Sequence, residues 1–492
     1  MLAFIIIAPT VVLYARGYRF DLHRGVFVHS GTISIKSNPQ DINVSIDGKT
    51  NSSKTLNRIN NSYNLTGLMP GTLDMTISAD GYQTWSKKAE VHSGLASEFW
   101  NVLLVKNNYT KTDYNTGGIG KFFISPKSKY IIYTQNSAGD LTTDILDIKS
   151  KQIANTFTFP GWKFISDARK ENIEWSPNED YISVPVARTI SRSTSPQLKS
   201  MPTIETTQYA YFILDPVTNK SFNLNDQLKN NDISYVRWDP KDKNYLFYLN
   251  NNILYRANVN NASDITQIAQ DVSSFDLSKT NVYYSVMPHE LVYKANLDGS
   301  GSRDQITSDF PDDITKNFRL IVYDDIRIAF LTQNKDLYIF NAGEFDTYSR
   351  KLGSDIEGIQ FSDDGKKLLY WTNNAMSVYY LRDWNVQPTR SENSNEDITR
   401  YSDEIKNVQW SKDYEHVIFS IGSQMKIIEL DPRDHRNCMD LPKTTSDTPL
   451  IGYNHAQERL YFVDTKDSST SLYSIVFPDP TAILGIYTPP NN

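Results

Sequence analysis

One short pattern recurs along the chain and constrains its fold more than any other feature. An aromatic or aliphatic residue is followed by a short polar turn, and a second apolar segment begins six residues after the first residue. The clearest copy runs from Trp175 through Ser176-Pro177 to the segment that starts at Tyr181. Further copies begin at Trp238, Phe361 and Trp410, and weaker ones at Ile124, Phe275, Ile321 and Tyr453. Such a repeat is interpreted first, because it decides the architecture.

The pattern divides most of the chain into units of propeller-blade length. The units begin near residues 121, 172, 233, 272, 318, 356, 406 and 449, a spacing of about 40 to 50 residues that is typical of four-stranded blades. We therefore expect a β-propeller over residues 121–488 with about eight blades, or seven if a weak unit near 318 or 449 belongs elsewhere. Ala482–Tyr487 could supply the last outer strand. Equivalent inner-strand aromatics are expected to be buried between blades: Tyr133, Phe247, Tyr284, Phe330, Tyr370 and Phe419.

Composition supports an all-β protein and excludes several classes of function. The 492 residues include 30 Tyr and 22 Phe in alternating apolar segments, with few long helical patterns. The net charge of -7 is small and scattered, which argues against a dedicated nucleic-acid-binding protein. The single cysteine, Cys438, excludes an internal disulfide and a multi-cysteine zinc site.

A smaller β-sandwich is expected over residues 29–107, before the propeller. Thr32–Ser37 alternates apolar and polar residues, as a half-buried strand does. Asp47-Gly48 is a strong hairpin signal. Turns at Asn38–Asp41, Leu68–Gly71 and Ala79–Tyr82 separate further short apolar runs. We expect a small antiparallel sandwich, joined to the propeller by a polar linker over residues 108–120.

The order of these turns resembles the PEGA domain. The matching residues are Pro39, Asp47-Gly48, Leu68-Met69-Pro70-Gly71, Gly81-Tyr82 and Trp85. The tetrapeptide that names the family is degraded, because Pro39 is followed here by Gln40-Asp41-Ile42. The resemblance implies a noncatalytic surface module of the kind common in bacterial envelope proteins near a membrane anchor. A generic sandwich spacer would have almost the same role.

The propeller repeats resemble TolB-like, or WD40-like, repeats. The resemblance rests on Trp175-Ser176-Pro177, on Phe361–Lys366 and on the Asp298-Gly299-Ser300-Gly301 turn. In that family the first pattern joins the first strand of a blade to the second, and the Asp-Gly-Ser-Gly turn joins the third strand to the fourth. The resemblance implies a bacterial envelope protein whose propeller offers a binding face.

The N-terminal segment is almost wholly apolar over residues 2–14. As a helix it would span about 20 Å, short of the roughly 30 Å hydrocarbon core, and it lacks the features of a signal peptide. It is either the end of a membrane helix whose beginning is missing or a short buried strand. We favour the first, a membrane-anchor remnant over residues 1–20. Arg16, Arg19 and Arg24 follow, and alone they would place that side in the cytoplasm.

Two blade units are stretched by polar segments. Arg188–Gln208 is rich in Ser and Thr and contains Pro196 and Pro202, and Val386–Glu404 is polar and charged. Both are interpreted as long surface loops. Long loops in compact domains are often functional, so any binding face is expected to involve them.

No catalytic, cofactor-binding or metal-binding residue can be chosen from the sequence. The seven histidines lack metal-ligand spacing, and neither a Gly-x-Ser-x-Gly elbow nor a P-loop occurs. Asp312-Asp313 and Asp363-Asp364-Gly365 lack the spacing of a calcium loop and are interpreted as ordinary turns. Among 57 acidic residues, no catalytic pair can be selected. The ligand-binding residues are unknown at this stage.

These observations predict a noncatalytic, membrane-anchored extracytoplasmic binding or scaffold protein. We expect one N-terminal anchor in the cell membrane and a propeller face that engages envelope proteins or glycans, with no cofactor and no nucleic acid. The alternative is a propeller-type hydrolase or lyase that acts on an envelope polysaccharide, with carboxylates near the central channel. A propeller alone does not distinguish them, because one fold hosts many functions.

Overall fold

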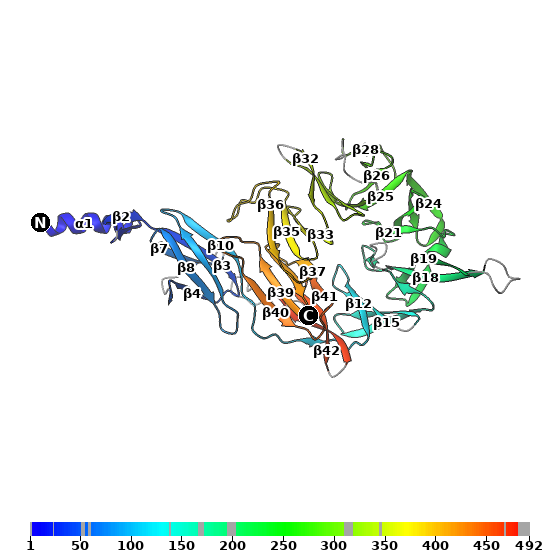
Figure 1. Ribbon diagram of the computed structural model, residues 1–492, viewed down its shortest axis with the longest axis horizontal. Coiled ribbons are helices and arrows are strands. Elements are labelled where there is room, and N and C mark those ends of the chain that lie inside the picture. The colour runs from blue at the N-terminus through cyan, green and yellow to red at the C-terminus, as the bar shows by residue number, and fades with distance from the viewer. Residues whose placement is uncertain are drawn as a thin grey trace. The chain divides into compact units, whose positions relative to one another are not determined.

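The computed structural model describes residues 2–22, 24–50, 55–57, 61–136, 139–165, 172–193, 203–308, 318–343, 347–466 and 469–480. The chain forms two compact units. The first comprises Met1–Asp113, Asn374–Asp464 and Tyr473–Asn492, and the second comprises Tyr114–Asn373 and Thr465–Leu472. Nearly all described elements are strands, which confirms the all-β class (Figure 1).

The N-terminal apolar segment is a helix, α1 (Leu2–Ala15). The prediction of a short buried strand at this place is therefore wrong. Ile7, Val11, Val12 and Tyr14 expose more than half of their surface. Within the described residues, no helix combines the length and the apolar character needed to cross a membrane.

A two-stranded hairpin, β1 (Tyr18–Asp21) and β2 (Val26–His29), follows the helix. Phe20 and Phe27 are cross-strand partners whose ring centroids lie 5.2 Å apart. Arg19 connects the two elements: its guanidinium lies 3.7 Å from the Tyr14 ring centroid and donates to the Tyr14 carbonyl oxygen at 3.1 Å.

The next domain is a sandwich of two four-stranded sheets, with strand orders β10-β3-β7-β6 and β5-β4-β8-β9. The pairs are antiparallel except for β10 and β3, which run parallel. Alternating apolar residues such as Ile33, Ile35 and Ile77 face inward and are fully buried. The strands are β3 (Gly31–Asn38), β4 (Asn43–Ile46), β5 (Lys49–Thr50), β6 (Thr55–Asn57), β7 (Ser62–Leu68), β8 (Gly71–Ser78), β9 (Trp85–Val91) and β10 (Ala96–Leu103).

The remaining described strands form eight blade sheets, as predicted for a β-propeller of about eight blades. The first sheet contains β12 (Ile119–Ile124), β13 (Tyr130–Asn136), β14 (Leu141–Asp147) and β15 (Gln152–Phe159), and the second contains β16 (Lys163–Phe164), β17 (Glu174–Trp175), β18 (Ile182–Ser193), β19 (Thr203–Asp215) and β20 (Lys220–Asn223). The third contains β21 (Ser234–Trp238), β22 (Tyr245–Asn250), β23 (Ile253–Asn258) and β24 (Asn261–Ala269). The fourth contains β25 (Val272–Leu277), β26 (Asn281–Val286), β27 (Leu291–Asn296) and β28 (Asp304–Gln305). A short helix, α2 (Leu224–Gln227), follows β20.

The other four blade sheets follow in chain order. The fifth sheet contains β29 (Phe318–Asp324), β30 (Arg327–Thr332), β31 (Leu337–Ala342) and β32 (Thr347–Gly353), and the sixth contains β33 (Gly358–Phe361), β34 (Lys367–Trp371), β35 (Ala375–Tyr380) and β36 (Asn395–Arg400). The seventh contains β37 (Ile405–Trp410), β38 (His416–Ile421), β39 (Gln424–Glu429) and β40 (Cys438–Lys443). The eighth contains β41 (Ile451–Asn454), β42 (Arg459–Lys466) and β43 (Ser469–Val476), and β11 (Thr112–Asp113) is its fourth strand.

The recurrent sequence pattern forms the turn between the first two strands of a blade. The serine hydroxyl after the anchor accepts a hydrogen bond from the backbone N–H five residues on, at 3.0 Å in Ser125, Ser176 and Ser362. A serine hydroxyl is short enough to close such a turn on its own backbone. The predicted inner-strand aromatics are all buried, with at most 5% exposure, which confirms their place in the core.

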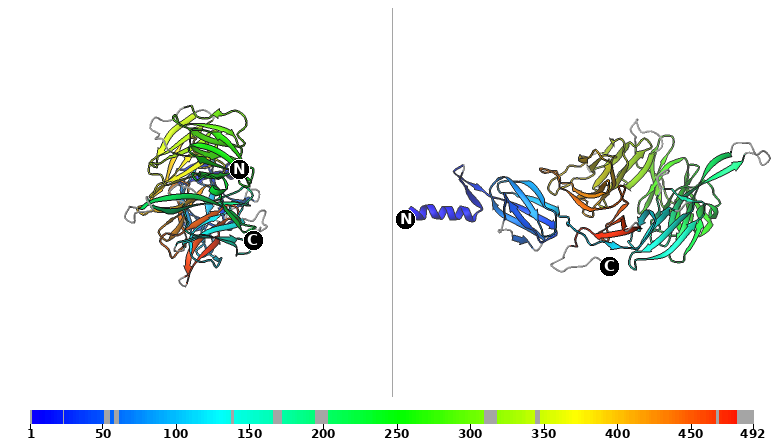
Figure 2. Two further views of the ribbon diagram at one scale, coloured as in Figure 1. Left: turned by 90° about the vertical axis from the view of Figure 1, so that its right-hand side faces the viewer. Right: turned by 60° about the horizontal axis from the view of Figure 1, so that its bottom comes forward.

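One loop prediction was wrong, and a second was right only in part. Most of Arg188–Gln208 is paired in the β18–β19 hairpin, from Arg188 with Gln208 to Ser193 with Thr203, and residues 194–202 lie outside the described residues (Figure 2). Threonine and isoleucine favour strands, so the Ser/Thr-rich composition misled the interpretation. Val386–Glu404 contains strand β36.

The last blade sheet takes its fourth strand from the beginning of the propeller sequence. Thr112 pairs with Ser474 and Asp113 with Tyr473, so β11, inside the predicted linker, holds the place next to β43. Ala482–Tyr487, which was predicted to supply an outer strand, lies outside the described residues. A two-residue strand carries too little periodicity to be recognised in a sequence.

Gly31 tests the packing of the sandwich. A Cβ atom at this position would lie 2.4 Å from the His92 carbonyl oxygen and 2.5 Å from Val91 Cγ1. We expect Gly31→Ala to lower the free energy of unfolding by about 1–3 kcal/mol, the usual cost of overpacking. Urea unfolding followed by circular dichroism measures this. Gly117→Ala is the control, because nothing lies within 4 Å of its added Cβ; equal effects of the two substitutions would contradict the packing.

Candidate functional site

Two clusters of charged side chains stand out, one in each unit. The first, in the first unit, lies where edge strand β9 meets the loop between β39 and β40. The Lys88 N–H donates to Asp434 Oδ2 at 3.0 Å. The Asn437 side chain accepts from the Ser86 N–H at 3.3 Å and donates to the Ser86 carbonyl at 3.2 Å. The loop thus satisfies the free edge of β9, which would otherwise be open to other strands.

Lys87 is the centre of this contact, and its side chain is completely buried. Its ammonium lies 2.7 Å from Glu429 Oε1. It also donates to three backbone carbonyl oxygens of the β39–β40 loop, those of Asp431 (3.0 Å), Arg433 (2.9 Å) and His435. A buried ammonium is tolerated only when it is paired and fully hydrogen-bonded, and here every proton has an acceptor.

Glu429 is equally well satisfied. It accepts from Trp85 Nε1 at 2.9 Å and from the Asn437 N–H at 2.7 Å. Nearby, two guanidinium nitrogens of Arg433 donate to the Asp431 carboxylate. The same guanidinium donates to the Glu98 carbonyl at 2.8 Å and lies 3.9 Å from the Phe99 ring centroid. We call these residues the β9 clamp: Trp85, Lys87, Glu429, Asp431, Arg433 and Asn437.

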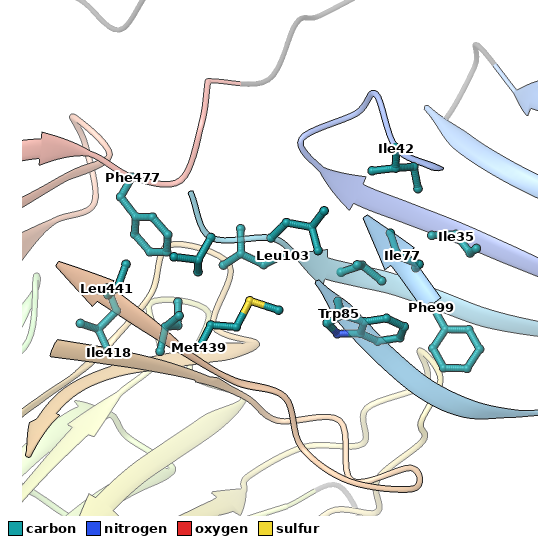
Figure 3. Packing of buried hydrophobic residues seen from close by; sticks show 14 of the residues in the cluster. Ile35, Ile42, Ile77, Trp85, Phe99, Leu103, Ile418, Met439, Leu441 and Phe477 are labelled. Carbon is teal, nitrogen blue, oxygen red and sulfur yellow. The ribbon is translucent and has the colours of Figure 1, made fainter. Parts of the chain in front are cut away.

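The neighbours of Asp431 in the clamp favour its ionised form. Burial opposes ionisation of Asp431, but Arg433 and Lys87 outweigh it and hold the pKa of Asp431 below its ordinary value. Apolar residues continue the contact: Leu103, Met439 and Leu441 belong to one buried cluster with the sandwich core (Figure 3). The clamp therefore fixes the sandwich on the β37–β40 sheet.

The segment Val386–Glu404 also contributes to this contact. Gln387 accepts from the Glu98 N–H at 3.0 Å and donates to the Ala96 carbonyl at 3.2 Å. Together with Trp85 and Glu429, Gln387 lines a cavity of about 20 Å³, which has room for a single water molecule. This predicted binding loop thus packs on the sandwich, and its cavity is too small for an organic ligand.

The second cluster lies in the second unit and brings together the first strands of four successive blade sheets. Glu174 comes from β17, Arg237 from β21, Asp276 from β25 and Arg319 from β29. Arg237 bridges the two acids: its Nε lies 2.6 Å from Glu174 Oε1, and its Nη1 lies 3.0 Å from Asp276 Oδ1. We call these four residues the inner-strand cluster.

Three residues of the inner-strand cluster are accessible to solvent, whereas Asp276 is 5% exposed. The side chains of Arg237 and Glu174 keep 34% and 26% of their surface accessible, and Arg319 is exposed. The guanidinium of Arg319 makes no hydrogen bond or ion pair to a described residue, and its backbone pairs with Leu331. Desolvation by the surrounding strands and the charge of Arg237 lower the pKa of Arg319, while Asp276 and Glu174 oppose that shift. Desolvation raises the pKa of Glu174, against the pull of Arg237.

A groove of about 560 Å³ runs along the β18–β19 hairpin. This size is typical of small-ligand sites. Its walls come from the predicted binding segment Arg188–Gln208 and from the approach to β21. The lining residues are Ile190, Thr206, Thr207, Gln208, Tyr209, Asn231, Asp232 and Ile233.

The acidic turns considered for calcium do not form a site in the described residues. Donors of the protein occupy the Asp363-Asp364-Gly365 turn: Ser362 and the Lys366 N–H donate to Asp364, and Arg327 donates to the Gly365 carbonyl. Asp312-Asp313 lies outside the described residues. In the part of the chain that the structure describes, no group of three or more His, Cys, Asp or Glu side chains could hold a metal ion.

Sequence reasoning missed both clusters. The only local signal was a charged residue directly before an anchor of the repeat, Glu174 before Trp175 and Arg237 before Trp238. The partners of the clamp are separated by more than 340 residues, so no local pattern indicates them.

Comparison with known families supports the prediction made for the first domain. Residues 30–103 match the PEGA domain family, which confirms that part of the resemblance. No curated protein matches the chain. The resemblance of the propeller to TolB-like repeats stays a prediction.

Solved structures similar to this chain include several β-propellers. The Dos1 propeller is 12% identical with a TM-score of 0.46, and the match covers 74% of this chain and 95% of that one. The Myceliophteria thermophila Cps50 (Swd1) β-propeller domain is 10% identical with a TM-score of 0.40, covering 75% and 99%. Kluyveromyces lactis Hsv2 is 10% identical with a TM-score of 0.40, covering 67% and 99%. Likenesses this low indicate nothing about ligands.

The contacts of the clamp predict that substitution of Lys87 strongly lowers the free energy of unfolding. Lys87→Ala leaves Glu429 and three carbonyls buried without their donor, so we expect a loss of about 3–5 kcal/mol in the free energy of unfolding. Urea unfolding of the full chain measures it. Lys88→Ala, on the exposed neighbour, should cost less than about 0.5 kcal/mol. If both substitutions have the same small effect, the clamp does not hold the domain.

The environment of His416 predicts that the stability of the fold depends on pH. Its ring is buried, with Nδ1 2.7 Å from Asp413 Oδ2. Burial lowers its pKa, but Asp413, Glu429 and Glu415 outweigh burial and raise the pKa of His416 above 6.5. The stabilisation is therefore fully present below the unfolded pKa and is lost as pH rises through the folded pKa. Urea midpoints should fall over that interval, and His416→Gln should flatten the profile. His92→Gln, on an exposed ring, should leave it unchanged; a flat wild-type profile would contradict the assignment.

Proposed function

We propose that this chain is a noncatalytic, membrane-anchored, extracytoplasmic scaffold whose propeller presents a ligand-binding face. A PEGA domain followed by a propeller indicates a binding or scaffold role. The observation that carries the membrane part of the proposal is the exposed apolar surface at the N-terminus.

This surface extends from α1 into the following hairpin. On α1, Ile7, Val11 and Tyr14 each expose 58–59% of their surface. On the hairpin, Leu22 exposes 86% and Phe20 47%. Contiguous exposed apolar groups are unfavourable in water and mark a lipid or protein contact. A bilayer would remove this surface from water.

Basic and aromatic residues follow the helix in the order expected at a membrane surface. Arg19 stacks on Tyr14, and Arg16 and Arg24 lie nearby in the sequence. Aromatic rings favour the interface, and guanidinium groups favour anionic headgroups. These arginines alone favour a cytoplasmic orientation, whereas the PEGA resemblance favours the outside. Orientation is therefore the decisive measurement.

The clamp supports the scaffold part of the proposal. It joins the sandwich to the β37–β40 sheet by directional bonds at Lys87 and Glu429. An anchored sandwich would therefore hold this sheet at a fixed place near the membrane, which a free linker would not do.

The enzyme alternative has one observation in its favour. Glu174 and Asp276 are two carboxylates on the first strands of the blade sheets before and after that of Arg237, and burial raises the pKa of Glu174, as for a general acid. However, Arg237 pairs with both acids. Formation of reducing ends or unsaturated sugars from an acidic polysaccharide, abolished by Glu174→Gln, would favour the enzyme.

The proposal predicts that the propeller is accessible from outside the cell. A C-terminal tag on the full-length protein should be removed when protease is added to intact cells. A cytoplasmic protein in the same cells must stay intact as a control. Protection in intact cells with cleavage only after lysis would contradict surface exposure, and selective permeabilisation of an outer membrane would then separate periplasm from cytoplasm.

Fractionation of the same cells tests the anchor. Val11→Asp places a charge on α1, at a cost of about 2.5–3.5 kcal/mol in a membrane helix, and should move protein into the soluble fraction. Val217→Asp is the matched control, because Val217 is also exposed but lies in the second unit.

A further inference from the structure

The backbone at Tyr235 is strained beside the inner-strand cluster. In strand β21, Ser234 pairs with Leu249 and Arg237 with Phe247, so one extra residue forms a β-bulge. Tyr235 lies in this bulge with φ of 53°, a left-handed conformation that is uncommon for an aromatic residue. Its side chain is 45% exposed, so burial in the core does not explain the strain.

Another blade provides an internal comparison. Strand β37 has a bulge between Lys406 and Gln409, and Asn407 has φ of 55° there. Asparagine tolerates this conformation, and Asn407 uses its amide to donate to Ser420 Oγ and to the Pro449 carbonyl, both at 2.9 Å. Tyrosine is the costlier choice. Strain of this kind at an exposed residue is typical of functional sites.

Arg319 supplies an available positive charge next to this tyrosine. The electrostatic neighbours of its guanidinium are Arg237, Asp276, Glu174 and Tyr235. The two acids are already paired with Arg237, which leaves Arg319 without an ion-pair partner among the described residues. A guanidinium that is exposed and lacks a partner is suited to bind a carboxylate.

Asp276 holds Arg237 in place within the cluster. The residue is 5% exposed, and its Oδ2 accepts from the Val322 N–H at 2.8 Å. Its Oδ1 is also buried and pairs with Arg237 Nη1 at 3.0 Å. A buried carboxylate paired in this way orients the guanidinium of Arg237.

We infer that Tyr235, Arg237, Asp276 and Arg319 form a binding site for a glycan that carries uronic acid residues. Arg319 would bind the sugar carboxylate, Tyr235 would contact the apolar face of a pyranose ring, and Asp276 would hold Arg237 beside them. This inference rests on the proposed binding role of the propeller and names its ligand class.

The chemistry of the site favours a sugar over an acidic peptide or a metal ion. A peptide carboxylate could pair with Arg319, but an acidic side chain brings neither a ring face to Tyr235 nor a hydroxyl donor to the accessible Glu174. A divalent cation is disfavoured, because Arg237 already lies between the two carboxylates. A uronate has a carboxylate, hydroxyl groups and a ring face in one unit.

Binding of short oligogalacturonate to the purified full chain, measured by calorimetry, tests the inference. The matched neutral probe is the methyl ester of the same oligomer, which keeps the ring and removes the charge. We expect the acid to bind at least about tenfold more tightly than the ester, as for loss of a charged hydrogen bond. Arg319→Ala should remove this preference. Arg303→Ala, which affects a guanidinium over the Tyr293 ring, is the control and should keep it.

Tyr235→Asn separates binding from folding. Asparagine tolerates positive φ, so the unfolding midpoint should be unchanged or raised, while affinity for the acid should fall at least about tenfold. Equal binding of acid and ester, equal effects of Arg319→Ala and Arg303→Ala, or no binding at all would overturn the inference. Equal binding of poly-glutamate would assign the site to acidic peptides instead. Membrane fractionation and protease accessibility do not depend on this site, so they report separately on the scaffold proposal.

Discussion

The position of the PEGA domain depends on one buried ammonium group, that of Lys87. An apolar contact alone is non-directional, and the cluster containing Leu103, Met439 and Leu441 would tolerate small displacements. Lys87 removes that freedom, because its charge is satisfied only when Glu429 and three carbonyls of the β39–β40 loop lie around it. The same bonds fix the loop. A buried ion pair contributes less to net stability than to a unique geometry, and a unique geometry is what a scaffold requires.

The two charged clusters differ in whether their charges are satisfied. In the β9 clamp each ionised group has a partner of opposite charge or a set of carbonyls, and the adjoining cavity admits a single water. In the inner-strand cluster, Arg237 is paired twice, while Arg319 is exposed and its guanidinium has no ion-pair partner among the described residues. The first arrangement is complete and structural. The second is incomplete without a further molecule, which is why we assign binding to it.

The sequence predicted those features whose causes are local. Ser176 and Ser362 close their own turns, and buried aromatics such as Phe247 and Phe419 recur at the repeat spacing, so the propeller and its blade count could be derived. Features that depend on distant partners could not. Lys87 pairs with Glu429, which lies 342 residues later in the chain, and the four residues of the inner-strand cluster come from four sheets. The β18–β19 hairpin was missed for another reason, since its Ser/Thr-rich strands have the composition of a loop.

Repetition makes each blade a control for the others. The bulged first strands β21 and β37 place a residue with positive φ at the same point, and the chain uses asparagine in one and tyrosine in the other. The asparagine needs no explanation beyond its tolerance of that backbone and its two hydrogen bonds. The tyrosine has a conformational cost and leaves much of its ring in water. A departure from the repeat that costs stability, next to a guanidinium that has no partner among the described residues, is better explained by a ligand than by folding.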